Sequence, residues 1–130
     1  MDRQRAFGFT LLELFIAVAT VSMVTAIAVP SYVNQLRKSA RAEAESFLFA
    51  AAARQEQYLR ERGRYAMDLA SLDARPPVLL TGKYTFAVTA IDGSQPAFTL
   101  TAIAAGEQRK DACPALALDS GGARFPRACW

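Results

Sequence analysis

The first half of the chain carries two hydrophobic patterns in succession. Residues 9–29 form an apolar run of twenty-one residues in which Glu13 is the only charged side chain. As a helix this run is about 31 Å long, which matches the ~30 Å hydrocarbon core of a bilayer. After Pro30, apolar residues recur mostly three or four positions apart as far as Gly63, which is typical of an amphipathic helix. The patterns predict a helical stalk: a membrane-length first half over 9–29 and an amphipathic continuation over 30–63.

Pro30 stands at the junction of the two patterns. A proline inside a helix removes a backbone N–H donor, so it either kinks one continuous helix or separates two helices. We expect the kink, with two separate helices as the alternative. Gly63 follows two basic residues and is a suitable C-cap for the second half. The apolar stripe of that half comprises Leu36, Ala40, Ala44, Phe47, Leu48, Ala51, Tyr58 and Leu59.

The rest of the chain shows strand patterns. Residues 84–91 and 98–103 alternate in polarity and flank a turn signal at 92–96, so they predict a hairpin. Shorter runs at 115–118 and 123–125 predict two further strands. A long helix followed by about four antiparallel strands gives an α+β fold, in which the helical stripe covers one face of the sheet. Between helix and hairpin we expect a loop, pinned to the core by Tyr65, Leu69 and Leu72.

The composition argues against an enzyme. The 130 residues include no histidine, which excludes nucleophilic sites and metal sites built on that residue. The net charge of +3 is too small to require a nucleic-acid partner. The acidic residues of the head are scattered and form no loop of closely spaced oxygen ligands. We therefore expect no catalytic residues, no cofactor and no metal site. The scattered acidic residues are Asp68, Asp73, Asp92, Asp111 and Asp119.

Glu13 demands an explanation, because a carboxylate within an apolar span costs a few kcal/mol on insertion scales. A secretory signal peptide with a cleavage motif at 26–28 leaves this charge unexplained, and so does a plain membrane anchor. A third interpretation gives Glu13 a partner. A cut between Gly8 and Phe9 would create an amine four residues before the carboxylate and leave the apolar helix attached to the mature protein.

The segment 8–14, GFTLLEL, preceded by a short basic leader and followed by Pro30 at the end of the apolar run, resembles the N-terminus of type IV prepilins. The resemblance implies that residues 1–8 are a leader peptide, which a prepilin peptidase removes after Gly8. It also implies that Phe9 is then N-methylated. By the same resemblance, Glu13 pairs with the N-terminal amine of a neighbouring subunit in the filament.

Cys113 and Cys129 are the only cysteines. Two cysteines around a turn-rich segment of a small exported domain favour a disulfide, and two free thiols in a cytosolic domain are the alternative. A disulfide places the head, residues 64–130, outside the cytoplasm. Type IV pilins typically carry such a C-terminal disulfide loop. The segments GRYA at 63–66 and LALDSGGAR at 116–124, with the final Cys129-Trp130, resemble PilE-type minor pilins.

The resemblance implies a structural minor subunit of a type IV pilus. Such a subunit takes part in pilus assembly and initiation, and hence in twitching motility, adhesion or DNA uptake. Its expected partners are the major pilin, other minor pilins, the prepilin peptidase and the inner-membrane assembly machinery. It would be a single-pass inner-membrane protein of a Gram-negative bacterium, with a cytoplasmic N-terminus and a periplasmic head, and later part of an extracellular fimbrium. The alternatives are a type II secretion pseudopilin, a competence pilin whose head binds DNA, and a membrane-anchored enzyme.

Basic and aromatic residues near the cysteines are candidates for nucleic-acid contact. Cations that contact phosphates and aromatic rings that stack on bases are the usual means of binding single strands. The ordinary interpretation is a solvated edge with Phe125 in the core. The residues concerned are Arg109, Lys110, Arg124, Phe125, Arg127 and Trp130.

Overall fold

The computed structural model of the protein describes residues 8–130, and the first seven residues of the expected leader lie outside the described residues. The chain divides into two compact units, one ending at Gln35 and the other comprising Leu36–Trp130. Helix α1 (Leu11–Arg62) begins in the first unit and ends in the second, and Pro30 lies inside it. The alternative of two separate helices is therefore wrong.

The first unit is helical from Leu11, and several of its hydroxyl groups are bonded within the helix. The N–H of Glu13 donates to Oγ1 of Thr10 at 3.2 Å, which caps the first turn. Farther along, Thr20, Ser22 and Thr25 each donate a hydroxyl to carbonyls one turn earlier. Among the described residues one helix, α1, is long and apolar enough to cross a membrane, with a mean hydropathy of 2.2 in its most apolar window. A helix with internally bonded hydroxyls suits a lipid environment.

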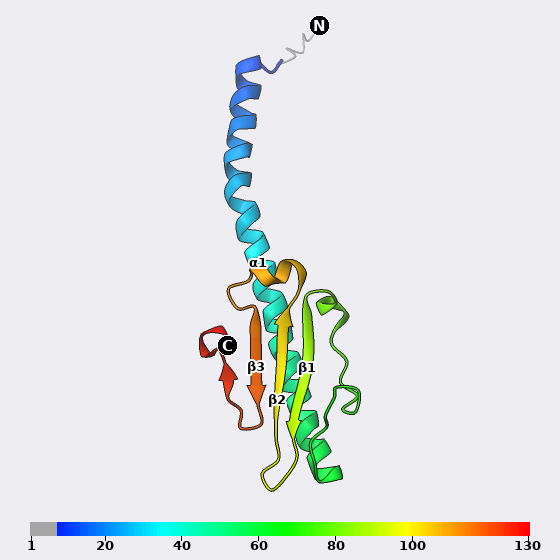
Figure 1. Ribbon diagram of the computed structural model, residues 1–130. Coiled ribbons are helices and arrows are strands. Elements are labelled where there is room, and N and C mark those ends of the chain that lie inside the picture. Colours follow the sequence, from blue (N-terminus) through cyan, green and yellow to red (C-terminus); the bar gives the residue numbers. More distant parts are fainter. Residues whose placement is uncertain (1–7) are drawn as a thin grey trace. The chain divides into compact units, whose positions relative to one another are not determined.

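The second unit contains a four-stranded antiparallel sheet. The strands are β1 (Tyr84–Ile91), β2 (Ala97–Ala104), β3 (Ala115–Asp119) and β4 (Arg124–Phe125), in the spatial order β1-β2-β3-β4. Strands β2, β3 and β4 each pair with the strand before them in the chain, as Figure 1 shows. The predicted hairpin and the predicted α+β fold are confirmed.

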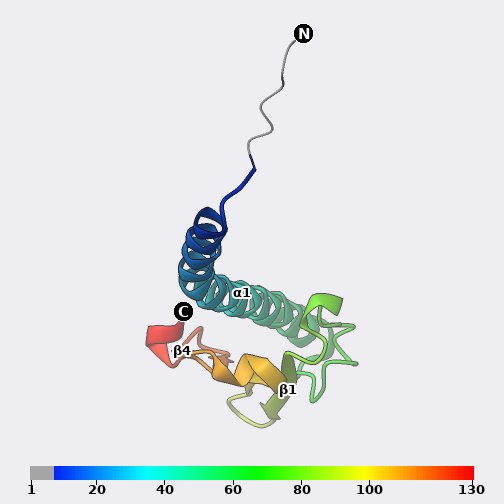
Figure 2. The ribbon, with the colours of Figure 1, turned by 90° about the horizontal axis from the view of Figure 1, so that it is seen from above.

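The part of α1 in this unit lies against one face of the sheet, so the second unit, Leu36–Trp130, which we call the head from here on, has two layers (Figure 2). Its small side chains bring the helix close to the sheet, while Phe47 and Leu48 fill the space between the layers. The Phe47 ring meets the Phe86 ring edge-on, at 4.6 Å between centroids. Leu36 is half exposed, because it precedes the part of the helix that the sheet covers. The helix residues buried in the core are Ala40, Ala44, Phe47, Leu48 and Ala51.

The helix ends as predicted, and the loop after it is fixed to the core. Gly63 adopts a φ of 73° and donates its N–H to the carbonyl of Leu59 at 2.8 Å. Tyr65 and Leu72 are buried, as expected. Gln55 was not expected in the core, because its side chain is polar. It is fully buried, and its amide exchanges hydrogen bonds of 2.8 and 2.9 Å with the backbone N–H and carbonyl of Ala66.

Three short 3-10 helices were not predicted. They are η1 (Val78–Leu80), η2 (Gly106–Lys110) and η3 (Arg127–Cys129). Each is too short to produce a periodic hydrophobic pattern, which is the signal from which longer elements are recognised. In η1, the N–H of Leu80 donates to the carbonyl of Pro77 at 2.9 Å, and Leu80 is buried.

We expect Gln55→Ala to lower the free energy of unfolding by about 2–3 kcal/mol, because it leaves both backbone groups of Ala66 buried without partners. Thermal or denaturant unfolding of the full chain in detergent, followed by near-UV circular dichroism, measures the change. Gln57→Ala is the matched control, since Gln57 is exposed and bonds only to the side chain of Glu61. Equal losses in the two variants would contradict the proposed role of Gln55.

Candidate functional site

The residues of the expected processing site lie at the start of the first unit. Gly8 and Phe9 precede the helix and are exposed, and no atom outside the neighbouring residues lies within 4 Å of the position of a Cβ on Gly8. Glu13 is in the first turn of α1 and is also exposed. A carboxylate in the first turn of a helix interacts favourably with the positive end of the helix dipole.

A second group of candidate residues gathers where β4 and η3 lie beside α1. The Phe49 ring, from α1, meets the Trp130 ring edge-on at 5.5 Å between centroids. The guanidinium carbon of Arg124 lies 5.2 Å from the centroid of the same Phe49 ring. Phe49, Arg124 and Trp130 are hereafter the Arg124 cluster. A hollow of about 340 Å³, lined in part by Arg124, Arg127 and Trp130, lies beside it.

The register of β4 decides which predicted residues join this cluster. Arg124 pairs with Leu118, which is buried on the face that packs against the helix, so Arg124 points to that side. Phe125 pairs with Ala117 and points to the opposite face, where it is 51% exposed. The expectation that Phe125 lies in the core is therefore wrong. Its carbonyl accepts a hydrogen bond from Nε1 of Trp130 at 3.2 Å.

Phe49, which is the centre of the cluster, was not predicted from the sequence. Phe49 directly follows Leu48 and lies outside the apolar stripe, so the helical periodicity did not predict that its ring contacts the rest of the head. An aromatic residue beside the stripe of an amphipathic helix is the signal that could have identified it.

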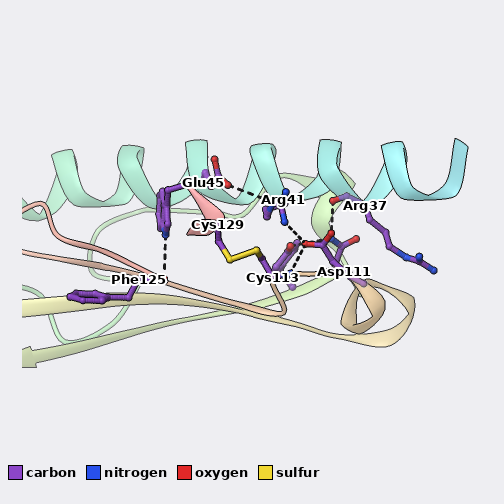
Figure 3. Close-up of polar contacts among 10 residues, drawn as sticks. Arg37, Arg41, Glu45, Asp111, Cys113, Phe125 and Cys129 are labelled. Atoms are coloured by element: carbon purple, nitrogen blue, oxygen red, sulfur yellow. Dashed lines mark hydrogen bonds and ion pairs between the residues drawn. A yellow bond between two sulfur atoms is a disulfide. The ribbon is translucent and has the colours of Figure 1, made fainter. Parts of the chain in front are cut away.

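A disulfide between Cys113 and Cys129 connects the end of η3 to the segment after η2, with 5.8 Å between the Cα atoms. Beside it, Arg41 of α1 lies between two carboxylates, as Figure 3 shows. Nη1 of Arg41 is 3.0 Å from Oδ2 of Asp111, and its Nε is 3.9 Å from Oε1 of Glu45. Asp111 also accepts a hydrogen bond from the N–H of Cys113 at 3.3 Å. The ion pair thus anchors the cysteine segment to the helix.

Burial strengthens the electrostatic interactions among Arg41, Asp111 and Glu45. The Asp111 side chain is only 6% exposed and Arg41 is also largely buried, so water screens their attraction weakly. Partial burial raises the pKa of Glu45, although the guanidinium groups of Arg41 and Arg124 act in the opposite direction.

Arg109 and Lys110 lie on η2, which contacts α1 and the start of β1. Gln108 is buried and donates to the carbonyl of Arg37 at 2.9 Å and to the Tyr84 hydroxyl at 3.1 Å. Lys110 is 2.8 Å from the carboxylate of Glu107, and this ammonium group lowers the pKa of Glu107. The predicted basic surface is therefore divided between η2 and the Arg124 cluster. Across residues 8–130, no three His, Cys, Asp or Glu side chains lie close enough to hold a metal ion.

The fold is that of a type IV pilin. A solved structure, titled "High-Resolution Structure of a Type IV Pilin from Shewanella oneidensis", matches with a TM-score of 0.56 and 24% identity, over 72% of this chain and 97% of that chain. A family model described as "Type IV minor pilin ComP, DNA uptake sequence receptor" matches residues 30–117, more than half of the chain. The chain belongs to this family. The resemblance to type IV pilins seen in the sequence is confirmed.

Two curated proteins match shorter segments. The type IV major pilin protein PilA of Myxococcus xanthus is 37% identical over 59 residues, and the prepilin peptidase-dependent protein D of Escherichia coli is 48% identical over 40 residues. These segments cover 45% and 31% of this chain. The chain spans about a quarter of the length of these relatives, 27% and 26%. The family match ends at residue 117, so the Arg124 cluster includes residues beyond it.

We expect Asp111→Asn to destabilise the head by about 3 kcal/mol, because it removes the nearer counter-charge of the largely buried Arg41 and leaves only the Glu45 carboxylate, at 3.9 Å. The unfolding free energy of the full chain in detergent at neutral pH measures this effect. Asp73→Asn is the control, since Asp73 is 85% exposed and its 3.9 Å ion pair with Arg75 contributes little. An unchanged stability of the Asp111 variant would show that the Arg41 pair does not hold the cysteine segment.

Proposed function

We propose that the protein is a minor subunit of a type IV pilus, made as a membrane-anchored precursor and then assembled with other pilins. The observation that carries this proposal is the family match over residues 30–117, together with an apolar helix of bilayer length ahead of it. The role is assembly rather than catalysis, and we assign no enzymatic activity.

Processing is the first step of the proposed role. A prepilin peptidase cleaves between Gly8 and Phe9 and the new N-terminal Phe9 is methylated. Exposure of both residues ahead of the helix supports this step, because a peptidase needs access to an unstructured bond. The cut leaves Thr10 in place, so the mature helix keeps the cap on its first turn.

Assembly transfers the apolar helix from lipid into contact with the helices of the major pilin and other minor pilins, at the inner-membrane machinery. The large apolar side chains of residues 9–29 are exposed in the single chain and are available for these contacts. Glu13 pairs with the N-terminal amine of a neighbouring subunit, and unpaired burial of either charge would be costly. The head, closed by the Cys113–Cys129 disulfide, is periplasmic before assembly and extracellular in the pilus.

Glu13→Ala is expected to insert in the membrane but to be lost from purified pili, because it removes the charge that pairs with the neighbouring subunit. The amounts of the subunit in membrane and sheared-pilus fractions give the comparison. Ser22→Ala is the control within the same span, and its hydroxyl bonds only to the carbonyl of Val18. Intact mass of each variant verifies a start at methylated Phe9. Normal incorporation of Glu13→Ala would overturn the role of the carboxylate.

DNA recognition by the head is a second proposed function, favoured by two observations. The family description names a DNA uptake sequence receptor, and the Arg124 cluster presents a guanidinium and aromatic rings beside a hollow. The guanidinium of Arg124, oriented by its contact with Phe49, would bind a backbone phosphate. The rim of the hollow adds Arg127, a second cation for the same strand.

Arg124→Gln should weaken binding of duplex DNA by the full chain about five- to tenfold at low salt, and should reduce the slope of log K against log salt by about 1. Fluorescence anisotropy with a labelled duplex at several salt concentrations measures both quantities. Arg75→Gln is the control, because Arg75 is 92% exposed and far along the chain from the cluster. Equal weakening by the two substitutions would indicate only non-specific attraction to a basic protein.

A further inference from the structure

The positive charge of the head is concentrated at one end. Three segments, 36–41, 78–83 and 106–111, contain six of the thirteen Lys and Arg side chains found after Gln35 but only two of the ten acidic ones. The remainder of the head carries seven basic and eight acidic residues, so its charges nearly cancel. The six basic residues are Arg37, Lys38, Arg41, Lys83, Arg109 and Lys110.

These three segments meet in the fold. Gln108 of η2 donates to the carbonyl of Arg37 in α1, and the N–H of Ala105 donates to the carbonyl of Lys83 at 2.8 Å. The approach is close enough that a Cβ on Gly106 would lie 3.3 Å from the carbonyl oxygen of Gly82. We call this part of the molecule the η1–η2 end.

The same end exposes two consecutive large aliphatic side chains. Val78 is 87% exposed and Leu79 is 70% exposed, while the next residue, Leu80, is buried in the core. Burial of Leu80 holds η1 against the head with the two preceding side chains directed outward. Exposed aliphatic residues beside lysine and arginine are the combination that binds the interface of a membrane with anionic lipids.

The length of chain between the apolar segment and the head allows the η1–η2 end to reach the membrane surface. The expected membrane segment ends at Val29, and the head unit begins at Leu36. Even fully extended, seven residues reach at most about 25 Å. Leu36 belongs to the η1–η2 end, whereas Gly63 ends the helix at the other end of the head. When the apolar helix is inserted, the chain length therefore limits the distance from Leu36 to the end of the membrane segment, and the η1–η2 end can reach the bilayer surface.

We propose that the η1–η2 end binds the surface of an anionic phospholipid bilayer. Val78 and Leu79 enter the headgroup region, and Lys83, Arg109 and Lys110 contact lipid phosphates. The inference rests on the proposed function only for the insertion of the apolar helix. DNA also presents phosphates, but it offers no apolar layer to receive the two aliphatic side chains. The bound head is the form of the subunit before assembly.

Trp fluorescence in vesicles tests the proposal with the full chain. Trp130 is the only tryptophan, so Leu79→Trp in a Trp130→Phe background reports on position 79 alone. Phospholipids brominated near the top of the acyl chain quench a tryptophan that enters the interface. The matched control is Met67→Trp in the same background, because Met67 is 54% exposed and follows Gly63 at the other end of the head.

Quenching at position 79 is expected to exceed that at position 67 severalfold in an equal mixture of phosphatidylcholine and phosphatidylglycerol. It should fall in phosphatidylcholine alone, at high salt, and after Lys83→Gln, Arg109→Gln and Lys110→Gln together, because each condition weakens attraction to anionic lipid. Equal quenching at the two positions, or quenching that none of these changes lowers, would overturn the proposal.

Two further outcomes separate this inference from the proposed function. A chain that fails to float with vesicles contradicts both, since the apolar helix is then not inserted. A chain that floats without quenching at position 79 contradicts only the lipid contact. If the triple Gln variant loses duplex DNA binding in detergent while its quenching in vesicles is unchanged, these cations bind DNA, and the lipid assignment is overturned.

Discussion

The close packing of α1 against the sheet is the contact on which the rest of the structure depends. Alanines at 40, 44 and 51 let the helix approach the strands, and Phe47 and Leu48 fill the remaining space. The other segments of the head are held in place by residues of this helix. The loop after the helix is held by Gln55, the cysteine segment by Arg41, and η2 by the backbone of Arg37. A single helix thus positions segments that are otherwise short and irregular.

Two chemically distinct surfaces result from this arrangement. One forms where β4 and η3 lie beside Phe49, and it combines aromatic rings with the guanidinium of Arg124. The other forms at the η1–η2 end, where the segments that meet contain six cations and two exposed aliphatic side chains. The disulfide segment runs between them, from Asp111 after η2 to Cys129 at the end of η3. The head can therefore face a membrane and a second partner with different parts of its surface.

The long elements could be predicted from the sequence because each repeats a pattern. The helix to Arg62, the hairpin and the two shorter strands follow from periodicity and turn residues. The Arg124 cluster was predicted in part. Arg124 and Trp130 were identified, but the two-residue strand β4 decides which way the side chains of Arg124 and Phe125 point, and no periodicity exists over two residues. Phe49 and Gln55 were missed because each departs from the polarity that the helical pattern assigns to its position.

The hydroxyl groups of Thr20, Ser22 and Thr25 are each bonded to the backbone of their own helix. Such a helix presents neighbours with a surface of hydrocarbon and already satisfied oxygen atoms. Contacts along it can therefore form and separate without breaking hydrogen bonds between molecules, apart from those of Glu13. A span of this kind can pass from lipid into contact with protein, which is the property required of a membrane-anchored subunit that is later part of a pilus.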